Sequence, residues 1–231
     1  MTINKINTSK DLAAKNFWNK RSTIKWFKNY PYSEYWVSFF KSHQGKKTAK
    51  VLDLGCGGGR NIEMLINFGY DVYACDKYGG MVAQTRLRLR GMGIDLERAR
   101  ERVMRQSMIK LSYSNNYFDI ILSHGVYHNA TSMTEFEHSI AESSRVLRRG
   151  GYLCFNIFTS RYISKDIKIV DASRCMYRTK DDLPMVLVSK DVFYEIVNRY
   201  GFDKHKNDVE YISSVATGKR SVLRGVLVKN Q

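Results

Sequence analysis

The sequence has no apolar run that approaches the ~20 residues needed to cross a lipid bilayer. Its first dozen residues are polar and lack the apolar core of a secretory signal peptide. We therefore expect a cytoplasmic protein without a membrane partner.

Cysteine is scarce, and the four residues present show no CxxC spacing. Three of them, Cys56, Cys75 and Cys154, fall in or beside predicted buried strands, and the fourth is Cys175. Scattered thiols of this kind are typical of free cysteines in a hydrophobic core. We expect no disulfide framework and no metal site.

Acidic residues are also few, with 22 Asp and Glu against 38 Lys and Arg and a net charge of +16. Such a positive field attracts nucleic acid, anionic lipid or small acidic molecules. The basic residues are spread over the whole chain. The densest group is typical of a solvated helix face and comprises Arg86, Arg88, Arg90, Arg98, Arg100, Arg102 and Arg105. Charge alone therefore names no partner.

Residues 1–45 differ from the rest in their aromatic content. All three tryptophans lie here, at positions 18, 26 and 36, among several Phe and Tyr residues. The pattern is interrupted only by Pro31 and predicts two amphipathic helices docked on a larger body. Such aromatic residues either only pack against that body or form a cap over a site.

The clearest motif lies in residues 51–61, where an apolar run with one acid, Asp53, leads into a glycine-rich stretch. This pattern predicts a buried strand that turns sharply into a helix. A pyrophosphate-binding loop needs its third glycine where Arg60 stands, so the loop fits a phosphate poorly. The alternate glycines still let the backbone approach a ligand closely, and they are Gly55, Gly57 and Gly59.

Two acids follow the first two predicted strands. Asp53 lies at a strand's carboxyl end, where an open α/β sheet binds its ligand, and it suits a cationic or hydroxylated group. Asp76 closes the next apolar run about twenty residues on, the spacing at which an acid reaches ribose hydroxyls. We therefore expect a ligand with an ammonium group and a free ribose but no phosphate.

The chain here resembles the class I S-adenosylmethionine-dependent methyltransferases. Residues 53–59 are similar to their first motif, and Asp76 is similar to their ribose-binding acid. Residues 106–113 are similar to the adenine-binding segment, although Ser107 stands in place of its acid and leaves the backbone N–H of Met108 as the expected contact. Residues 17–21 are similar to the aromatic segment that reaches the methionine end, where Arg21 would meet the carboxylate. The resemblance implies S-adenosyl-L-methionine as cofactor, bound by Asp53, Gly55, Cys56, Gly57, Asn61, Asp76, Lys77, Met81, Ser107, Met108, Ser123 and Arg21.

Residues 123–129 resemble the family's fourth motif, whose strand end faces the transferable methyl group. They contain His124 and His128, and histidine is the side chain best suited to accept a proton near neutral pH. Either histidine is a candidate base, with His124 preferred, and Tyr127 would position the substrate. The alternative is that His128 only packs or hydrogen-bonds the backbone.

From residue 50 onward, strands and helices alternate regularly, with helices expected over 60–68, 81–92 and 134–147 and a short strand near 103–106. The chain closes with a predicted hairpin of strands at 209–215 and 221–228. We expect a doubly wound α/β fold: a seven-stranded, mostly parallel sheet with one antiparallel strand, plus the N-terminal helical cap.

Residues 159–184 lose this periodicity, and a loop-like segment of that length usually carries function. We expect a substrate-side insertion in a methyltransferase domain that spans 46–231. Its basic residues would meet an acidic group, and they are Lys165, Lys168, Arg174, Arg178 and Lys180.

The predicted function is methyl transfer to an O or N atom of a small, acidic molecule. One alternative is an RNA methyltransferase, which the net charge favours but which would lack a recognisable RNA-binding module. Another is a non-catalytic cofactor-binding subunit, against which the intact glycines and both acids count. The sequence leaves the acceptor and the oligomeric state open.

Overall fold

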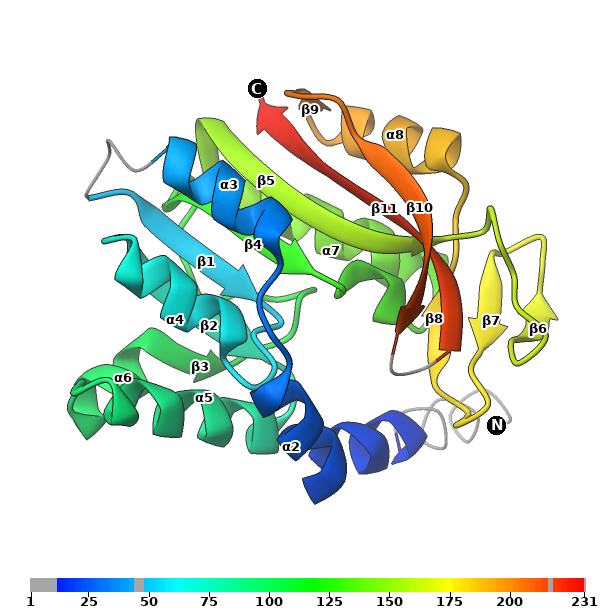
Figure 1. The fold of residues 1–231 in the computed structure, drawn as a ribbon. Coiled ribbons are helices and arrows are strands. Elements are labelled where there is room, and N and C mark those ends of the chain that lie inside the picture. The colour runs from blue at the N-terminus through cyan, green and yellow to red at the C-terminus, as the bar shows by residue number, and fades with distance from the viewer. Residues whose placement is uncertain (1–11, 44–47, 216–217, 231) are drawn as a thin grey trace, which may run out of the picture.

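The structure is a computed structural model that describes residues 12–43, 48–215 and 218–230. Its centre is one sheet in which seven strands follow the order β10-β11-β5-β4-β1-β2-β3, and an eighth, β9, pairs with β11 (Figure 1). Strands β1 to β5 pair in parallel, whereas β11 pairs antiparallel with β5. The strands are β1 Lys50–Leu54, β2 Asp71–Asp76, β3 Val103–Arg105, β4 Phe118–His124, β5 Leu147–Thr159, β9 Phe202–Lys204, β10 Val209–Val215 and β11 Gly218–Lys229.

This confirms the predicted mostly parallel sheet with one antiparallel strand. Strand β9 was not predicted, because three residues are too short to show a period of two. The three helices whose bounds were predicted, α4 Arg60–Asn67, α5 Gly79–Gly91 and α7 Met133–Val146, begin and end within two residues of those bounds. The other elements of this part are α6 Leu96–Arg102, α8 Lys190–Arg199 and a 3₁₀ turn, η1, at Tyr127–Asn129.

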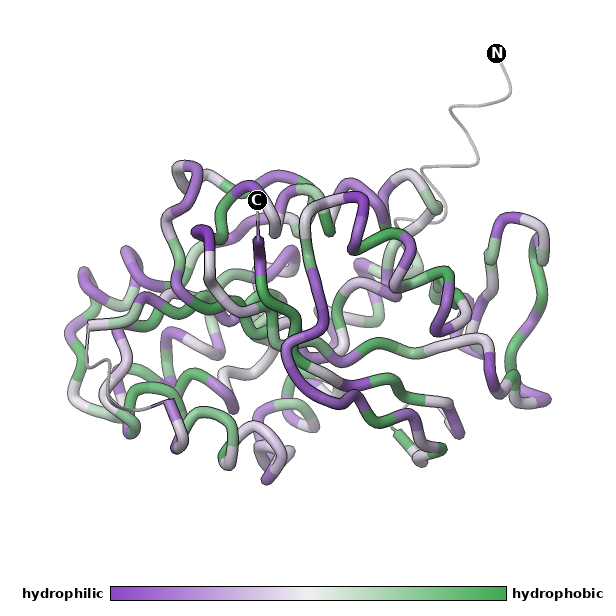
Figure 2. The backbone as a smooth tube through the Cα atoms, turned by 90° about the horizontal axis from the view of Figure 1, so that it is seen from above, coloured by the Kyte–Doolittle hydropathy of each residue, from purple (hydrophilic) through white to green (hydrophobic). Residues whose placement is uncertain are grey.

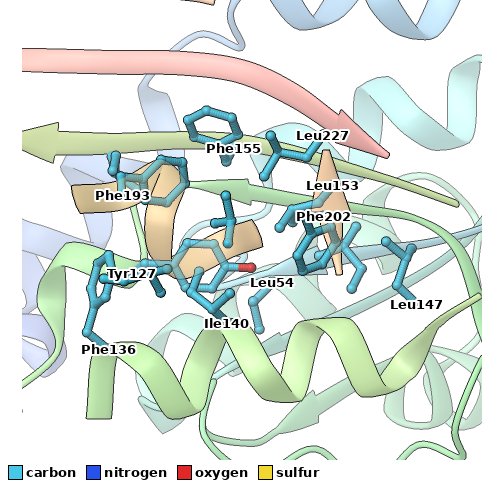
Figure 3. Packing of buried hydrophobic residues seen from close by; sticks show 14 of the residues in the cluster. Leu54, Tyr127, Phe136, Ile140, Leu147, Leu153, Phe155, Phe193, Phe202 and Leu227 are labelled. Carbon is cyan, nitrogen blue, oxygen red and sulfur yellow. The ribbon is translucent and has the colours of Figure 1, made fainter. Parts of the chain in front are cut away.

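Apolar side chains alternate between the two faces of the central strands, as a sheet covered on both sides requires. In β1, Val51 packs with α3, α4 and α5, whereas Leu52 packs with α7 and α8 on the opposite face. Figure 3 shows the core on the Leu52 face of the sheet, in which Phe136, Ile140 and Phe193 pack against strand residues. In Figure 2 the hydrophobic colour is concentrated in the interior strands, and hydrophilic residues predominate on the surrounding helices and turns. All four cysteines are free thiols, as expected.

The N-terminal region forms three helical segments, where the sequence predicted two. Residues 12–19 are helical, the chain is extended at Lys20, and α2 Arg21–Asn29 and α3 Glu34–Ser42 follow on either side of Pro31. The first break was missed because Lys20 is an ordinary helix former. Trp36 and Phe40 of α3 are fully buried in the core that also contains Val51, so α3 is an integral part of the α/β domain. The helix that lies beside the loops after β1 and β2 is α2 (Figure 1).

Residues 159–184 were expected to be loop-like, but they contain two strands of a separate three-stranded antiparallel sheet. Its strands are β6 Lys168–Asp171, β7 Met176–Arg178 and β8 Pro184–Val186. They are too short to produce a readable alternation. Arg220 of β11, which is 1% exposed, donates hydrogen bonds to Ser164 and Asp166 at 3.2 and 3.1 Å and so ties the insertion to the main sheet.

Among the described helices, none combines the length and apolar character that a membrane span requires.

Candidate active site

Two cavities adjoin at the edge of the sheet where β1, β2 and β4 have their carboxyl ends. The first is lined by the glycine loop, the end of β2 and residues 106–108, and the second lies between α2, β11 and the insertion. Seven residues line both cavities, and they are Trp18, Phe27, Arg60, His124, Gly125, Asn129 and Leu183. A ligand in one cavity would therefore lie next to a ligand in the other.

The glycine loop leaves no room for side chains at two positions. Gly55 has φ of +68°, and a Cβ there would lie 2.5 Å from a methyl carbon of Val126. A Cβ at Gly58 would lie 2.6 Å from the backbone nitrogen of Lys28 in α2. The loop is therefore closed on one side by Val126 and on the other by α2, which approaches it backbone to backbone.

Asp76 lines the first cavity at the end of β2. Its Oδ2 accepts the Gly57 N–H at 3.0 Å and its Oδ1 accepts the Tyr78 N–H at 2.9 Å. Burial raises the pKa of this carboxyl to about 6, even though both backbone donors act in the opposite direction. Each oxygen keeps a second lone pair, so the carboxylate can accept hydrogen bonds from a pair of ligand hydroxyls.

Asp53 lies behind the loop and does not line the cavity. Its Oδ1 accepts a hydrogen bond from the Asn61 side chain at 3.2 Å, and burial raises its pKa to about 7. Asn61 does line the cavity, and its own Oδ1 is buried without a partner. Asn61 thus lies between Asp53 and the first cavity, and its Oδ1 remains available to accept a hydrogen bond.

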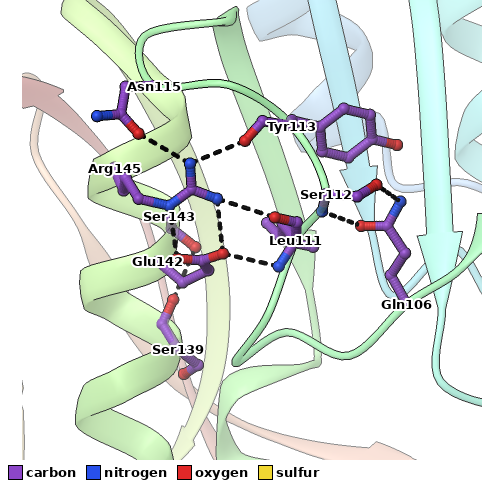
Figure 4. A network of polar contacts seen from close by, with 9 residues as sticks. All are labelled: Gln106, Leu111, Ser112, Tyr113, Asn115, Ser139, Glu142, Ser143 and Arg145. Carbon is purple, nitrogen blue, oxygen red and sulfur yellow. Dashed lines mark hydrogen bonds and ion pairs between the residues drawn. The ribbon is translucent and has the colours of Figure 1, made fainter.

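Residues 106–113 are held against α7 by the Glu142–Arg145 pair (Figure 4). Arg145 donates to the carbonyls of Leu111 and Tyr113 at 2.9 and 2.8 Å, and Glu142 accepts the Leu111 N–H at 2.7 Å. The hydrogen bond from Arg145 lowers the pKa of Glu142, so the pair stays ionised. This network fixes the position of residues 106–113, and two of these residues, Ser107 and Met108, line the first cavity.

The first cavity brings together most of the predicted cofactor residues, namely Gly55, Cys56, Gly57, Asn61, Asp76, Lys77, Met81, Ser107 and Met108. Ser123 is fully buried and Asp53 lies behind the loop, so neither lines it. Arg21 is exposed on α2 and also lies outside the lining. The arginine that lines the cavity is Arg60. A hydroxyl-binding carboxylate, a backbone loop and the apolar side chains of Met81, Met108 and Val126 suit a ligand with a ribose and a flat base.

His124 lies on the shared wall of the two cavities. Its Nδ1 lies 3.2 Å from a guanidinium nitrogen of Arg60, which can only donate. Burial, together with the charges of Arg60 and Arg224, holds the pKa of His124 well below its usual value. The neutral ring therefore accepts at Nδ1 and carries its proton at Nε2.

His128 is arranged in the same way. Its ring stacks on Phe158 at 3.9 Å between centroids, and its Nδ1 accepts the Phe158 N–H at 3.1 Å. Burial lowers the pKa of His128 to about 3. Its proton therefore also resides on Nε2, and the ring lines the second cavity as a hydrogen-bond donor.

Tyr127 lies among core residues rather than in either cavity (Figure 3). It is fully buried, and its hydroxyl lies 2.7 Å from the Ser143 hydroxyl in α7. The aromatic side chains of the second cavity come instead from the N-terminal region, including the connection between α2 and α3, and from β5 and β10; they include Trp26, Tyr30, Tyr32, Phe158 and Tyr211.

Two arginines of the second cavity, Arg60 and Arg224, were not predicted as site residues. The basic residues of the insertion that were expected to meet an acidic group do not line either cavity. Sequence signals for both arginines exist. Arg60 interrupts the glycine pattern, and Arg224 is the one charged residue within the apolar run 222–228.

Within the described residues, no group of three or more His, Cys, Asp or Glu side chains is placed to hold a metal ion.

Comparisons with known proteins identify the domain and the fold. Residues 52–155 match the family model described as a methyltransferase domain. Among curated proteins, no sequence matches the chain. An S-adenosylmethionine-dependent methyltransferase from Methanosarcina mazei is 16% identical with a TM-score of 0.66, and the match covers 82% of this chain and 96% of that one.

Two further solved structures share the fold. A protein from Pyrococcus horikoshii is 18% identical with a TM-score of 0.63, over 89% of this chain and 99% of that one. The 1,6-didemethyltoxoflavin-N1-methyltransferase of Burkholderia thailandensis, solved with its substrate and S-adenosylhomocysteine, is 16% identical with a TM-score of 0.59, over 98% of this chain and 87% of that one. At these identities the likeness establishes the fold.

The family match spans the glycine loop, Asp76 and the strand end that bears His124, all of which line one cavity at the carboxyl edge of the sheet. Residues 52–155 carry a methyltransferase domain, and the chain as a whole has the fold of S-adenosylmethionine-dependent methyltransferases.

Proposed function

We propose that this methyltransferase transfers the methyl group of S-adenosyl-L-methionine, bound in the first cavity, to an O or N atom of a small molecule bound in the second. The observation that carries the proposal is the wall shared by the two cavities, which contains His124 and Gly125. The neighbour from Burkholderia thailandensis acts on a small heterocycle, which supports a small acceptor here.

The cofactor supplies an already activated methyl group, so the chain's own task is to orient the acceptor and exclude water. Trp18 and Phe27 line both cavities from the N-terminal helices, and Leu183 does so from the insertion. We propose that residues 12–33 and 159–188 act together as the cover of the substrate side. The N-terminal part of this cover is shorter than the predicted cap of residues 1–45, because α3 is buried in the core of the α/β domain.

The histidines are better suited to hold the acceptor than to deprotonate it. In both rings Nδ1 already accepts a hydrogen bond, and a positive charge on either ring is disfavoured. Their Nε2–H groups would donate to an oxygen of the acceptor molecule and so orient it with the lone pair of its nucleophilic atom towards the methyl group. An amine, or a hydroxyl that is already ionised, would need no base.

The net charge favoured RNA, but several arginines of the densest basic group have partners within the fold. Arg86 donates to the Val103 carbonyl, Arg88 to the Gly58 carbonyl and Arg105 to the Lys77 carbonyl. Arg102 forms an ion pair with Asp71 and stacks on Tyr73. These roles are structural, and they weaken the case for a phosphate-binding surface.

The choice of acceptor class can be tested with labelled S-adenosylmethionine and a cell extract separated into metabolite and RNA fractions. We expect the label in the metabolite fraction, because the second cavity is walled by side chains on several sides. Label in RNA that survives protease and disappears on ribonuclease treatment would contradict the proposal.

Replacing Asp76 with alanine is expected to weaken S-adenosylhomocysteine binding by ~1.5–3 kcal/mol, since charge-assisted hydrogen bonds to the ribose are lost. Because the pKa of Asp76 is raised to about 6, wild-type affinity should be full above pH 7 and decline below pH 6, by at most about tenfold per pH unit. Calorimetry from pH 5 to 8 measures both effects.

Asp76→Asn should remove this pH dependence, whereas Asp191→Asn, at an exposed position on α8, should leave affinity and pH dependence unchanged. An unaltered pH profile in the Asp76 variant would rule out this carboxylate as the ribose ligand.

If His124 acts as a donor, His124→Gln should keep the transfer rate within about tenfold, because the amide supplies an N–H near the position of Nε2. His124→Leu should lose at least that factor through the missing hydrogen bond. His138→Gln, at an exposed position on α7, is the matched control. The measurement is the initial rate with the acceptor found by labelling.

A general base would give a different pattern. Both His124 variants would then lose about 100-fold or more, and the wild-type rate would fall tenfold per pH unit below the pKa of the base. That outcome would show that His124 acts as a general base.

A further inference from the structure

The second cavity contains two arginines and no acidic side chain in its lining. Arg60 begins α4 and lines both cavities, whereas Arg224 lies in the middle of β11 and lines only the second. In the described part of the chain, neither guanidinium lies within ion-pair distance of a carboxylate. Nine other arginines in the described residues do form an ion pair with a carboxylate, so the absence of one at these two positions requires an explanation.

Arg224 is held entirely by neutral groups. One guanidinium nitrogen donates to the Ser33 hydroxyl at 3.2 Å and another to the Tyr211 hydroxyl. The guanidinium also lies over the rings of Tyr35 and Tyr211 at 5.0 and 5.2 Å. Its Nε is buried and has no hydrogen-bond partner. The side chain is thus oriented by its surroundings, yet its charge is not neutralised.

Arg60 is held in a similar way. Its terminal nitrogens donate to the Pro31 carbonyl at 3.3 Å and to Nδ1 of His124, and its guanidinium lies 4.9 Å from the centre of the Tyr30 ring. Burial lowers the pKa of Arg60, the Asp53 carboxylate behind the glycine loop raises it in part, and the charge of Arg224 lowers it. A guanidinium has five N–H donors, so both side chains keep donors without a hydrogen-bond acceptor among the residues that the structure describes.

Burying a charge without a counter-charge is costly, and a site that does so with rigidly oriented donors is suited to a ligand of opposite sign. The walls around the two arginines carry several aromatic side chains, which include Trp18, Trp26, Phe27, Tyr30, Phe158 and Tyr211. Flat aromatic walls favour a flat ligand, because ring stacking adds to area burial.

We propose that Arg60 and Arg224 form the anion-binding end of the acceptor site, and that the methyl acceptor is a planar aromatic carboxylate. This inference rests on the proposed function and adds the chemical class of its substrate. Arg224 binds the carboxylate of the acceptor within the second cavity. Arg60 orients the same carboxylate relative to the wall that the two cavities share.

The test uses two pairs of probes that differ only in charge at one group: salicylate with salicylamide, and anthranilate with anthranilamide. The first pair offers an oxygen nucleophile and the second a nitrogen nucleophile. Binding to the full chain saturated with S-adenosylhomocysteine is measured by calorimetry. We expect each carboxylate to bind at least about tenfold more tightly than its amide, since a charge-assisted bidentate contact is lost in the amide.

Arg224→Met should remove this preference, while affinity for S-adenosylhomocysteine stays within about twofold of wild type, because Arg224 does not line the first cavity. Arg224→Lys keeps the charge but not the two-pronged donor geometry, and an intermediate preference is expected. This second variant keeps the test decisive if the methionine variant folds poorly. Arg199→Met, at an exposed ion pair on α8, is the matched control.

Equal binding of carboxylates and amides, or an unchanged preference in both Arg224 variants, would overturn the inference while leaving methyl transfer intact. Failure of the wild-type chain to bind S-adenosylhomocysteine would instead contradict the proposed function, and the inference would fall with it.

Discussion

The hydrogen bond from the Gly57 N–H to the Asp76 carboxylate joins the loop after β1 to the end of β2. It exists because β1 and β2 pair in parallel and in register, which brings their carboxyl ends to the same edge of the sheet. The loop can approach the acid because its glycines carry no side chains. This contact fixes one wall of the first cavity, and β4, on the other side of β1, supplies the opposite wall through Gly125 and Val126.

The second cavity depends on segments that are remote in sequence. α2 reaches the glycine loop because Gly58 and Gly80 leave room for Lys28 and Ile24. The insertion is held by Arg220 from β11, and its residues Thr179, Leu183 and Met185 reach the cavity. The substrate side is therefore assembled from three parts of the chain, whereas the cofactor side follows from local connections between neighbouring strands. Changes in acceptor would accordingly require changes in the N-terminal helices, the insertion or β11.

The cofactor side was predictable from sequence because each of its residues follows a strand at a short, fixed spacing. Asp76, Gly57 and Met108 all line the first cavity. Asp53 and Tyr127 belong to the same motifs, yet their side chains point away from the cavities into buried surroundings. A motif gives position along the chain, but the direction of a side chain at a strand end depends on the local turn.

The acceptor side was less accessible to sequence reasoning. Arg224 lies opposite Asn156 of β5 in a strand pair separated by many residues, and only that pairing brings it over the second cavity. The Lys and Arg residues of the insertion were expected to meet an acidic group, but they do not line either cavity. Composition does not tell which side chains point inward. The short strands β6, β7 and β8 escaped detection because three or four residues cannot display a period.

The central claim is that the two cavities are the donor and acceptor halves of one transfer site. A crystal structure of the chain with S-adenosylhomocysteine tests it most directly. The account predicts that the ribose hydroxyls lie on Asp76 and that the sulfur lies beside His124 and Gly125, facing the second cavity. A sulfur turned away from the second cavity, or a ribose remote from Asp76, would contradict it.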